Sequence, residues 1–188
     1  IMCIQADAYA KVRGFPKRLA GEDFYLLNKL AKVGPIKRLS GTPIILAGRT
    51  SDRVPFGTGV AITRIQQDLV EGKPYEVYNP AVFVALRYWL ETIDIAASAT
   101  DIEVVRQALY RMPDPIGSIL IKAVDDLNYL YSIERAIAEV SGKVRRKRLI
   151  DWHDAFRTLK LIHTLRDAGL NDVPADDVLK PFMTTRDQ

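Results

Sequence analysis

Two adjacent carboxylates, Glu22 and Asp23, are the residues of this sequence best placed to do chemistry. They follow Gly21 directly, and Gly21 closes a loop that carries Lys17 and Arg18. A glycine leaves the backbone open to close approach by a ligand. The pattern could therefore present a fixed carboxylate to a ligand beside a basic loop. It is also the pattern of acids in a first helical turn, where unpaired N–H groups and the helix dipole favour negative charge without any chemistry.

A helix over residues 22–33 must position these two acids. Its apolar residues recur at helical spacing, and Gly34 followed by Pro35 is a helix stop. Upstream of the loop, Asp7 can cap a brief helix that runs to Val12. The segments 1–5, 36–39 and 43–47 have the composition of short strands.

From about residue 60 the strand signals stop and helical patterns run almost to the end of the chain. Helices are predicted over residues 61–71, 80–97, 101–112, 118–140 and 151–168, with a polar tail after residue 171. The predicted fold class is therefore α/β followed by mostly α. The two parts are residues 1–59 and residues 60–188.

Composition excludes several classes of protein. The chain has 188 residues, 48% of them hydrophobic, so it can bury a core as one domain or as two small ones. Its formal charge of +4 is modest, so a general affinity for nucleic acid is not implied. No apolar run approaches the length of a membrane span. Cys3 is the single cysteine of the sequence, so an internal disulfide is excluded. We expect Cys3 to lie on a strand and to be buried in the core. We expect a cytoplasmic location and, from the apolar opening run Ile1-Met2-Cys3-Ile4, a piece of a longer protein.

Several residues around the two acids agree in spacing with one enzyme family: Gly14-Phe15, Gly21-Glu22-Asp23, Leu26, Lys29-Leu30 and Gly34. Over the first third of the chain they resemble the C-terminal part of the catalytic domain of family 2 glycosyltransferases. Arg13 stands where that family usually has the first glycine of Gly-Gly-Phe. The resemblance implies that residues 1–59 belong to a GT-A-like nucleotide-sugar-binding domain and that residues 60–188 are a helical extension. The nucleotide-binding half and its Asp-x-Asp metal motif would then lie before Ile1.

The resemblance also implies a role for each acid. In this family the Asp of the Glu-Asp pair is the general base that takes a proton from the acceptor hydroxyl, so Asp23 would be catalytic. Glu22 would hold the loop or contact hydroxyls of the acceptor. A sugar would pass from a nucleotide-sugar donor to a glycan, lipid-linked or small-molecule acceptor with inversion, as in the synthesis of bacterial envelope polysaccharide. A divalent metal, Mg or Mn, is expected through the Asp-x-Asp motif that these residues do not contain.

The loop of residues 48–59 is a second candidate region, because it carries Arg49 and Arg53. The leaving group would be a diphosphate, and the planar guanidinium suits phosphate oxygens. Backbone N–H groups around Thr58 and its flanking glycines could add contacts to the anion. Gly21 would admit the substrate beside the acids. The loop lacks the Lys-Ser/Thr ending of a phosphate-binding loop, and the alternative is a solvated linker between domains.

The strongest charge feature is the run Lys143-Val144-Arg145-Arg146-Lys147-Arg148, which follows a predicted helix stop. We expect a solvated basic turn here. A membrane-peripheral contact with anionic lipid is an alternative that suits a lipid-linked acceptor, and nucleic acid is not an expected partner. The run also supports a rival function for the whole chain, a non-catalytic helical interaction module with a basic contact surface. In that case Glu22 and Asp23 only start a helix.

The remaining candidates are weaker. His153 and His163 lie ten residues apart on one predicted helix, too far for a shared metal site. Asp151, His153 and Asp154 have no matching partner cluster, so they are expected to be surface polar residues and not metal ligands. No other set of residues predicts a metal site. Trp89 and Trp152 could stack on sugar rings, although packing in a core or interface is the expected role for most of the aromatic residues.

Overall fold

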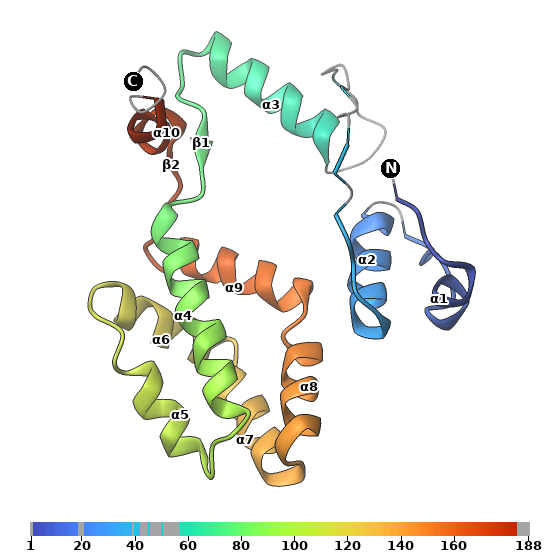
Figure 1. The fold of residues 1–188 in the computed structure, drawn as a ribbon. Helices are drawn as coiled ribbons and strands as arrows, with labels where there is room; N and C mark the ends of the chain where they lie inside the picture. The colour runs from blue at the N-terminus through green and yellow to red at the C-terminus, as the bar shows by residue number, and fades with distance from the viewer. Residues whose placement is uncertain are drawn as a thin grey trace. The chain divides into compact units, whose positions relative to one another are not determined.

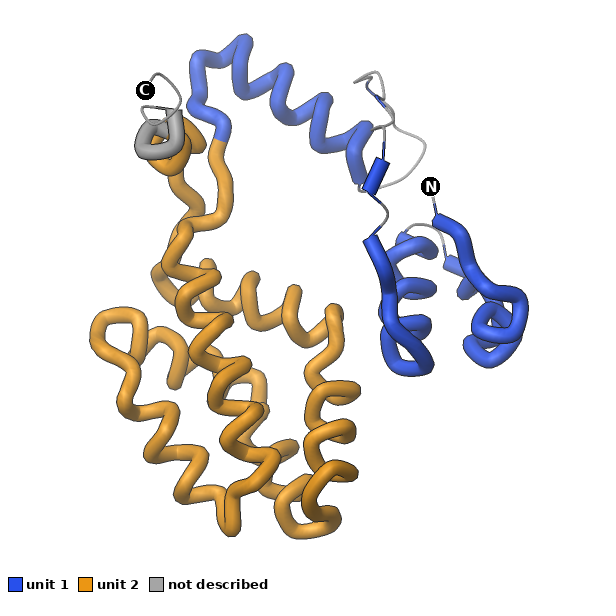
Figure 2. The backbone as a smooth tube through the Cα atoms, in the orientation of Figure 1, with its two compact units in different colours: residues 1–75 blue, residues 76–188 orange. Residues whose placement is uncertain are grey.

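The computed structural model describes residues 2–18, 21–38, 40, 41, 45, 50 and 57–183. The chain divides into two compact units, residues 1–75 and 76–188, which Figure 2 shows in different colours. Each unit has its own hydrophobic cluster. Most described residues lie in helices, so the expectation of a mostly helical part after residue 60 is confirmed. Within the described ranges, no helix combines the length and apolar character needed to cross a lipid bilayer.

The described residues of the first unit form three helices: α1 (Ala6–Lys11), α2 (Glu22–Val33) and α3 (Thr58–Val70). Helices α1 and α2 pack against each other around a small cluster in which Val12, Leu26 and Leu30 are buried. Ile4 and Ala8 cover this cluster from one side. The predicted helix over residues 22–33 is confirmed at both ends, and it stops at Gly34 as the sequence predicts.

The strands predicted for the first unit are not observed where the structure describes the chain. Residues 2–5 and 36–38 are extended, but neither segment belongs to a strand. A strand needs a hydrogen-bonded neighbour, and the described part of this unit supplies none to either segment. Cys3 is exposed, so its expected place in a core is wrong. Ile1, Leu39 and most of the 43–47 segment lie outside the described residues.

The second unit is a helical bundle with one small antiparallel sheet. Its elements are β1 (Glu76–Val77), α4 (Pro80–Ala96), α5 (Ile102–Leu109), α6 (Ile116–Asp126), α7 (Tyr129–Glu139), α8 (Gly142–Trp152), α9 (Ala155–Asp167), β2 (Val173–Pro174) and α10 (Ala175–Met183). Strand β1 pairs with β2, with Glu76 opposite Pro174. The stretch after residue 171, expected to be a polar tail, therefore contributes β2 and α10.

Helix α4 is the centre of the second unit, and it contacts α5, α6, α7, α8 and α9 (Figure 1). It starts as the sequence predicts: Pro80 occupies its first turn, and the Asn79 side chain accepts a hydrogen bond from the N–H of Ala81. Trp89 and Val82 on this helix are completely buried. Trp89 therefore belongs to the core. Truncating a buried tryptophan of this kind to alanine costs about 3–5 kcal/mol of stability.

Two of the long helices predicted for this unit are each interrupted in the structure. The predicted 118–140 helix divides at Asn128, which adopts a left-handed backbone conformation with φ of 55°. The predicted 151–168 helix divides at His153, and the Asp154 carboxylate caps the helix that follows. The residues before this second break form α8, so the basic run 143–148 lies in a helix and not in a turn.

Candidate functional site

The candidate site starts at Gly21, the residue that caps α2. Its φ of 70° lies in the left-handed region, which favours glycine. Helix α2 begins at the next residue, so Glu22 and Asp23 both lie in its first turn, and both are exposed. The structure therefore brings Gly21, Glu22 and Asp23 together at one helix start. The free N–H groups and the dipole of this helix end stabilise negative charge there.

The Asp23 carboxylate is oriented by its own helix. One of its oxygens, Oδ1, accepts a hydrogen bond of 2.7 Å from the backbone N–H of Phe24. The side chain remains exposed, so a ligand can reach the carboxylate from solvent. A general base must lie within hydrogen-bond distance of the proton it takes, and the exposed carboxylate leaves room for such an approach.

The loop before α2 also contributes a cation near this helix start. The guanidinium of Arg18 lies over the ring of Tyr25, with 4.0 Å between Cζ and the ring centroid. Such a cation–π contact is worth about 0.5–1 kcal/mol at an exposed site. Tyr25 lies two residues after Asp23, so the contact places Arg18 against the first turn of α2.

Three other residues that carry the family resemblance, Leu26, Lys29 and Leu30, hold α2 against α1. Leu26 and Leu30 are buried in the small cluster of the first unit. Lys29 donates a hydrogen bond from Nζ to the carbonyl oxygen of Val12, 3.0 Å away. Gly34 ends the helix. Each of these positions has a structural role, whereas Glu22 and Asp23 are exposed and contribute nothing to this core.

The turn after α1 is built around glycine-like backbone conformations. Arg13 has a φ of 59° and Gly14 a φ of 65°, so both lie in the left-handed region. A Cβ on Gly14 would come within 2.8 Å of the Tyr9 hydroxyl oxygen, and that hydroxyl accepts a hydrogen bond from the N–H of Phe15. Arg13 thus adopts the conformation that a glycine would favour, at the position where the resembled family has glycine.

A groove of about 820 Å³ lies elsewhere on the first unit. Its walls are the extended segments 2–5 and 34–38, one face of α1 and the C-terminal half of α2. Apolar side chains such as Ile4, Leu27 and Val33 line it. Glu22 and Asp23 do not line this groove, so the acids and the groove are separate features of the unit.

The arginines predicted for diphosphate binding, Arg49 and Arg53, lie outside the described residues. Thr58 is the first residue of α3, is exposed, and follows Gly57 with a φ of 124°. It therefore stands at the start of a different helix from the two acids. Among the described residues, no group of three or more His, Cys, Asp or Glu side chains could hold a metal ion. The adjacent acids alone do not form such a set, so no step is assigned to a metal here.

The basic run, interpreted from the sequence as a solvated turn, contains a buried arginine. Arg145 is 8% exposed, and its guanidinium donates to the carbonyl oxygens of Ala99, Val140 and Ile137 at 2.6, 2.7 and 3.1 Å. Two of these carbonyls end α7, where a helix leaves acceptors without intrahelical partners. Arg145 is therefore a structural residue.

The neighbours of Arg145 in the run form ion pairs across the second unit. Arg146 pairs with Asp94 at 3.1 Å, Lys147 with Asp151 at 2.6 Å and Arg148 with Glu139 at 2.7 Å. Each pair is solvent-exposed, so each contributes about 0–1 kcal/mol. These carboxylates reduce the net positive charge that the sequence run alone indicates.

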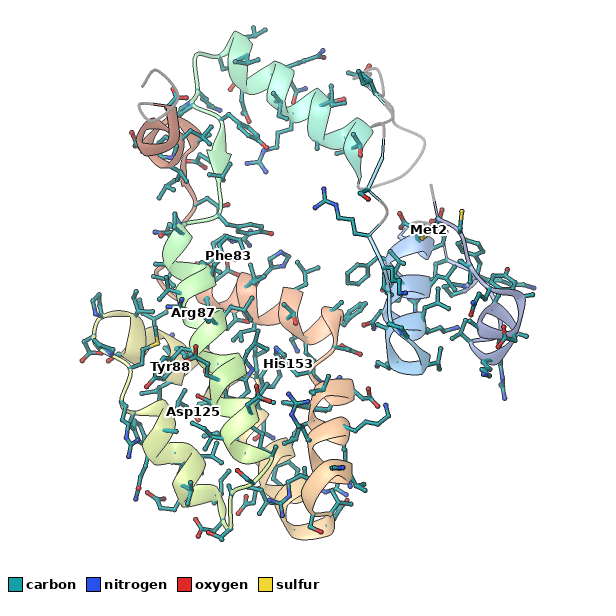
Figure 3. All side chains as sticks on the ribbon, in the orientation of Figure 1. Met2, Phe83, Arg87, Tyr88, Asp125 and His153 are labelled. Carbon is teal, nitrogen blue, oxygen red and sulfur yellow. The ribbon has the colours of Figure 1, made fainter. Side chains whose placement is uncertain are left out.

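His153 was expected at the surface, and this expectation is wrong. It is 7% exposed and lies at the α8–α9 junction on the side facing α4 (Figure 3). The indole N–H of Trp89 donates to its Nδ1 at 3.4 Å, while its Nε2 has no hydrogen-bond partner among the described residues. Burial lowers the pKa of His153 to about 4, and the nearby Arg157 guanidinium adds to the effect. Asp154, the N-cap of α9 directly after this residue, is the sequence signal that could have indicated the break.

Comparisons of the chain with family models, with curated proteins and with solved structures found no match.

Proposed function

We propose that this chain is the C-terminal part of an inverting, nucleotide-sugar-dependent glycosyltransferase, with Asp23 as the general base. One observation carries the proposal. Three of the spaced residues that resemble the family, Leu26, Lys29 and Leu30, hold α2 against α1, while the two acids are exposed at its start. A helix start held by a packed core is a rigid place for a catalytic group.

The proposed step is a single displacement. The acceptor hydroxyl gives its proton to the Asp23 carboxylate as its oxygen attacks the anomeric carbon of the donor sugar. The bond from that carbon to the nucleoside diphosphate breaks on the opposite face, so the configuration inverts. Placement of a general base typically contributes about 10²–10⁴-fold to the rate. Glu22 then holds the loop or contacts acceptor hydroxyls, and Gly21 leaves room for the substrate.

The donor half of the enzyme belongs to the proposal as well. We propose that the nucleotide-binding part of the GT-A-like domain, with its Asp-x-Asp motif for Mg or Mn, precedes Ile1 in the full-length protein. Arg49, Arg53 and Thr58 remain predicted contacts to the diphosphate. A cytoplasmic enzyme, peripheral to the membrane where the acceptor is lipid-linked, fits the proposed substrates.

The test is sugar transfer by the full-length protein with a radiolabelled nucleotide-sugar. Asp23→Asn keeps the shape of the side chain and removes the base, so turnover should fall by about 10²-fold or more while nucleotide-sugar binding is retained. Asp7→Asn is the matched control, since Asp7 is also an exposed acid in the first turn of a helix in the same unit. Turnover that is unchanged in Asp23→Asn would sink the base assignment. The 188-residue chain by itself should be inactive.

One observation favours a second candidate, a non-catalytic interaction module. Helix α3 is thirteen residues long and amphipathic, but none of its residues is buried. Leu69 and Val70 near its end are 66% and 88% exposed. If the chain works through this helix, the double variant Leu69→Ser, Val70→Ser should abolish self-association of the chain, measured by sedimentation equilibrium. In that case the wild-type full-length protein should show no sugar transfer.

A further inference from the structure

A small pocket of about 160 Å³ lies between α7 and α8 in the second unit. Helix α7 contributes Ser132 and Arg135 to its wall, and α8 contributes Arg148 and Trp152. Pockets for drug-sized ligands are typically about 300–1,000 Å³. This pocket is therefore suited to a single small ring and not to an extended ligand.

Two arginines at this pocket share one carboxylate. Glu139, the last residue of α7, accepts from Arg135 Nε and Nη2 at 3.1 and 2.7 Å, and its other oxygen lies 2.7 Å from Arg148 Nη2. These hydrogen bonds lower the pKa of Glu139, the bond from Arg135 having the largest effect. Two positive charges against one negative charge leave the group with an excess of one positive charge.

The shared carboxylate holds the arginines without exhausting their donors. Each guanidinium has five N–H donors in a planar fork, and Glu139 takes two from Arg135 and one from Arg148. In the described part of the chain, neither guanidinium bonds a further acceptor. The bonds to Glu139 restrict both guanidinium groups, and their remaining donors can bond a second oxyanion. The single excess charge matches a carboxylate better than a doubly charged phosphate.

The rest of the pocket lining contains both apolar and polar side chains. Leu149 and Ala136 are buried, 1% and 2% exposed, and Trp152 is half-buried, with the Arg157 guanidinium 5.2 Å from the centroid of its ring. Ser132 adds a hydroxyl group. A sugar ring presents a comparable mixture, because its C–H face packs on an aromatic ring while its hydroxyls bond polar groups.

We propose that the pocket between α7 and α8 binds a monosaccharide that carries a carboxylate, a hexuronate, with Arg135 and Arg148 on the carboxylate and Trp152 against the ring. The preference for a carboxylate follows from the charge and the arginine donors of the pocket alone. The choice of a sugar rests on the proposed glycosyltransferase function, in which this pocket would select an acidic glycan.

The test is titration of the 188-residue protein with D-glucuronate, followed by NMR of its two tryptophan indole N–H signals. The Trp152 signal should shift saturably with a dissociation constant of about 1 mM, while the signal of the buried Trp89 stays in place and reports an intact fold. Arg135→Gln and Arg148→Gln should each weaken binding by about tenfold or more. Arg87→Gln is the matched control, because Arg87 is an exposed arginine paired with Glu91 at 3.9 Å on α4.

Four outcomes would overturn the proposal. Equal shifts with D-glucose would remove the role of the carboxylate, and equal binding of acetate or inorganic phosphate would reduce the pocket to a general anion site. Weakening by Arg87→Gln as strong as by Arg148→Gln, or no saturable shift at all, would exclude the site. None of these outcomes affects the Asp23→Asn assay, so failure of the pocket and failure of the transferase function are distinguishable.

Discussion

Lys29 on α2 donates a hydrogen bond to the carbonyl oxygen of Val12 at the end of α1, with 3.0 Å between Nζ and O. The two residues are seventeen positions apart, and the loop before the acids lies between them. This bond and the packing of Leu26 and Leu30 join α2 to α1. The position of the proposed base therefore depends on residues that touch no substrate.

Replacing Lys29 by Met keeps most of the side chain and removes the donor. We expect unit 1 to lose about 1 kcal/mol of stability, seen as faster amide hydrogen exchange along α2 and unchanged exchange along α4. Lys11→Met is the control, since Lys11 makes an exposed ion pair with Asp7 at 3.6 Å. Equal exchange in both variants would contradict a positioning role for Lys29.

Gly14→Ala should destabilise the first unit by about 1–2 kcal/mol. The added Cβ would approach the Tyr9 hydroxyl oxygen to 2.8 Å, and alanine is strained at the φ of 65° found here. Gly34→Ala is the matched variant, because nothing lies within 4 Å of a Cβ there and its φ of −176° is ordinary extended backbone. Hydrogen exchange in α2 at increasing urea concentration would measure the stability of the first unit in both variants. A larger loss of stability in Gly34→Ala than in Gly14→Ala would refute this explanation.

Arg145→Gln should destabilise the second unit by about 3 kcal/mol, because up to three carbonyl oxygens lose their donor in a buried place. Arg146→Gln, next in the chain, removes an exposed ion pair and should change stability by about 1 kcal/mol or less. Thermal unfolding of the two variants would compare them directly. Similar losses in both would show that burial of Arg145 does not matter to stability.

The second unit should lose stability as pH falls from 6.5 towards 4. His153 has its ordinary pKa of about 6.5 in the unfolded chain and a pKa of about 4 in the fold, because burial disfavours its charged form. The unfolded state therefore binds more protons throughout this window, and stability declines on acidification by up to about 3 kcal/mol. The contribution is fully present above pH 6.5.

His153→Gln separates this effect from the titration of carboxylates. Glutamine does not titrate, so the difference in unfolding free energy between wild type and variant should change across pH 6.5 to 4. His163→Gln is the control, since His163 is only half-buried and bonds the Tyr78 hydroxyl at 3.0 Å. A difference between wild type and His153→Gln that stays constant with pH would contradict a shifted pKa.

Several features of the fold could be predicted from the sequence because a local signal defines them. The start of α4 follows from Pro80 after a capping Asn79, and the end of α2 follows from Gly34 before Pro35. The break at Asn128 has no glycine or proline, and asparagine is only occasionally left-handed. A 3.6-residue pattern that continues through such a break predicts one helix where the structure has two.

The site was predictable to a similar extent. The exposed acids after Gly21 are apparent from the sequence, because a glycine before a helix start is a local signal. The burial of Arg145 and His153 is not, since it depends on contacts with Ala99 and Trp89, which lie 46 and 64 positions away. The pocket between α7 and α8 likewise requires knowing that the two helices pack side by side.

The three carbonyls that hold Arg145 have a consequence for the order of folding. Ala99 follows α4, while Ile137 and Val140 end α7, so the acceptors come from two separate places in the chain. A guanidinium buried before its acceptors are assembled would be an uncompensated charge. We therefore expect α8 to dock after α4, α5 and α7 have met, so α8 would form late in the folding of the bundle. Substitutions at Arg145 should then mainly change the unfolding rate.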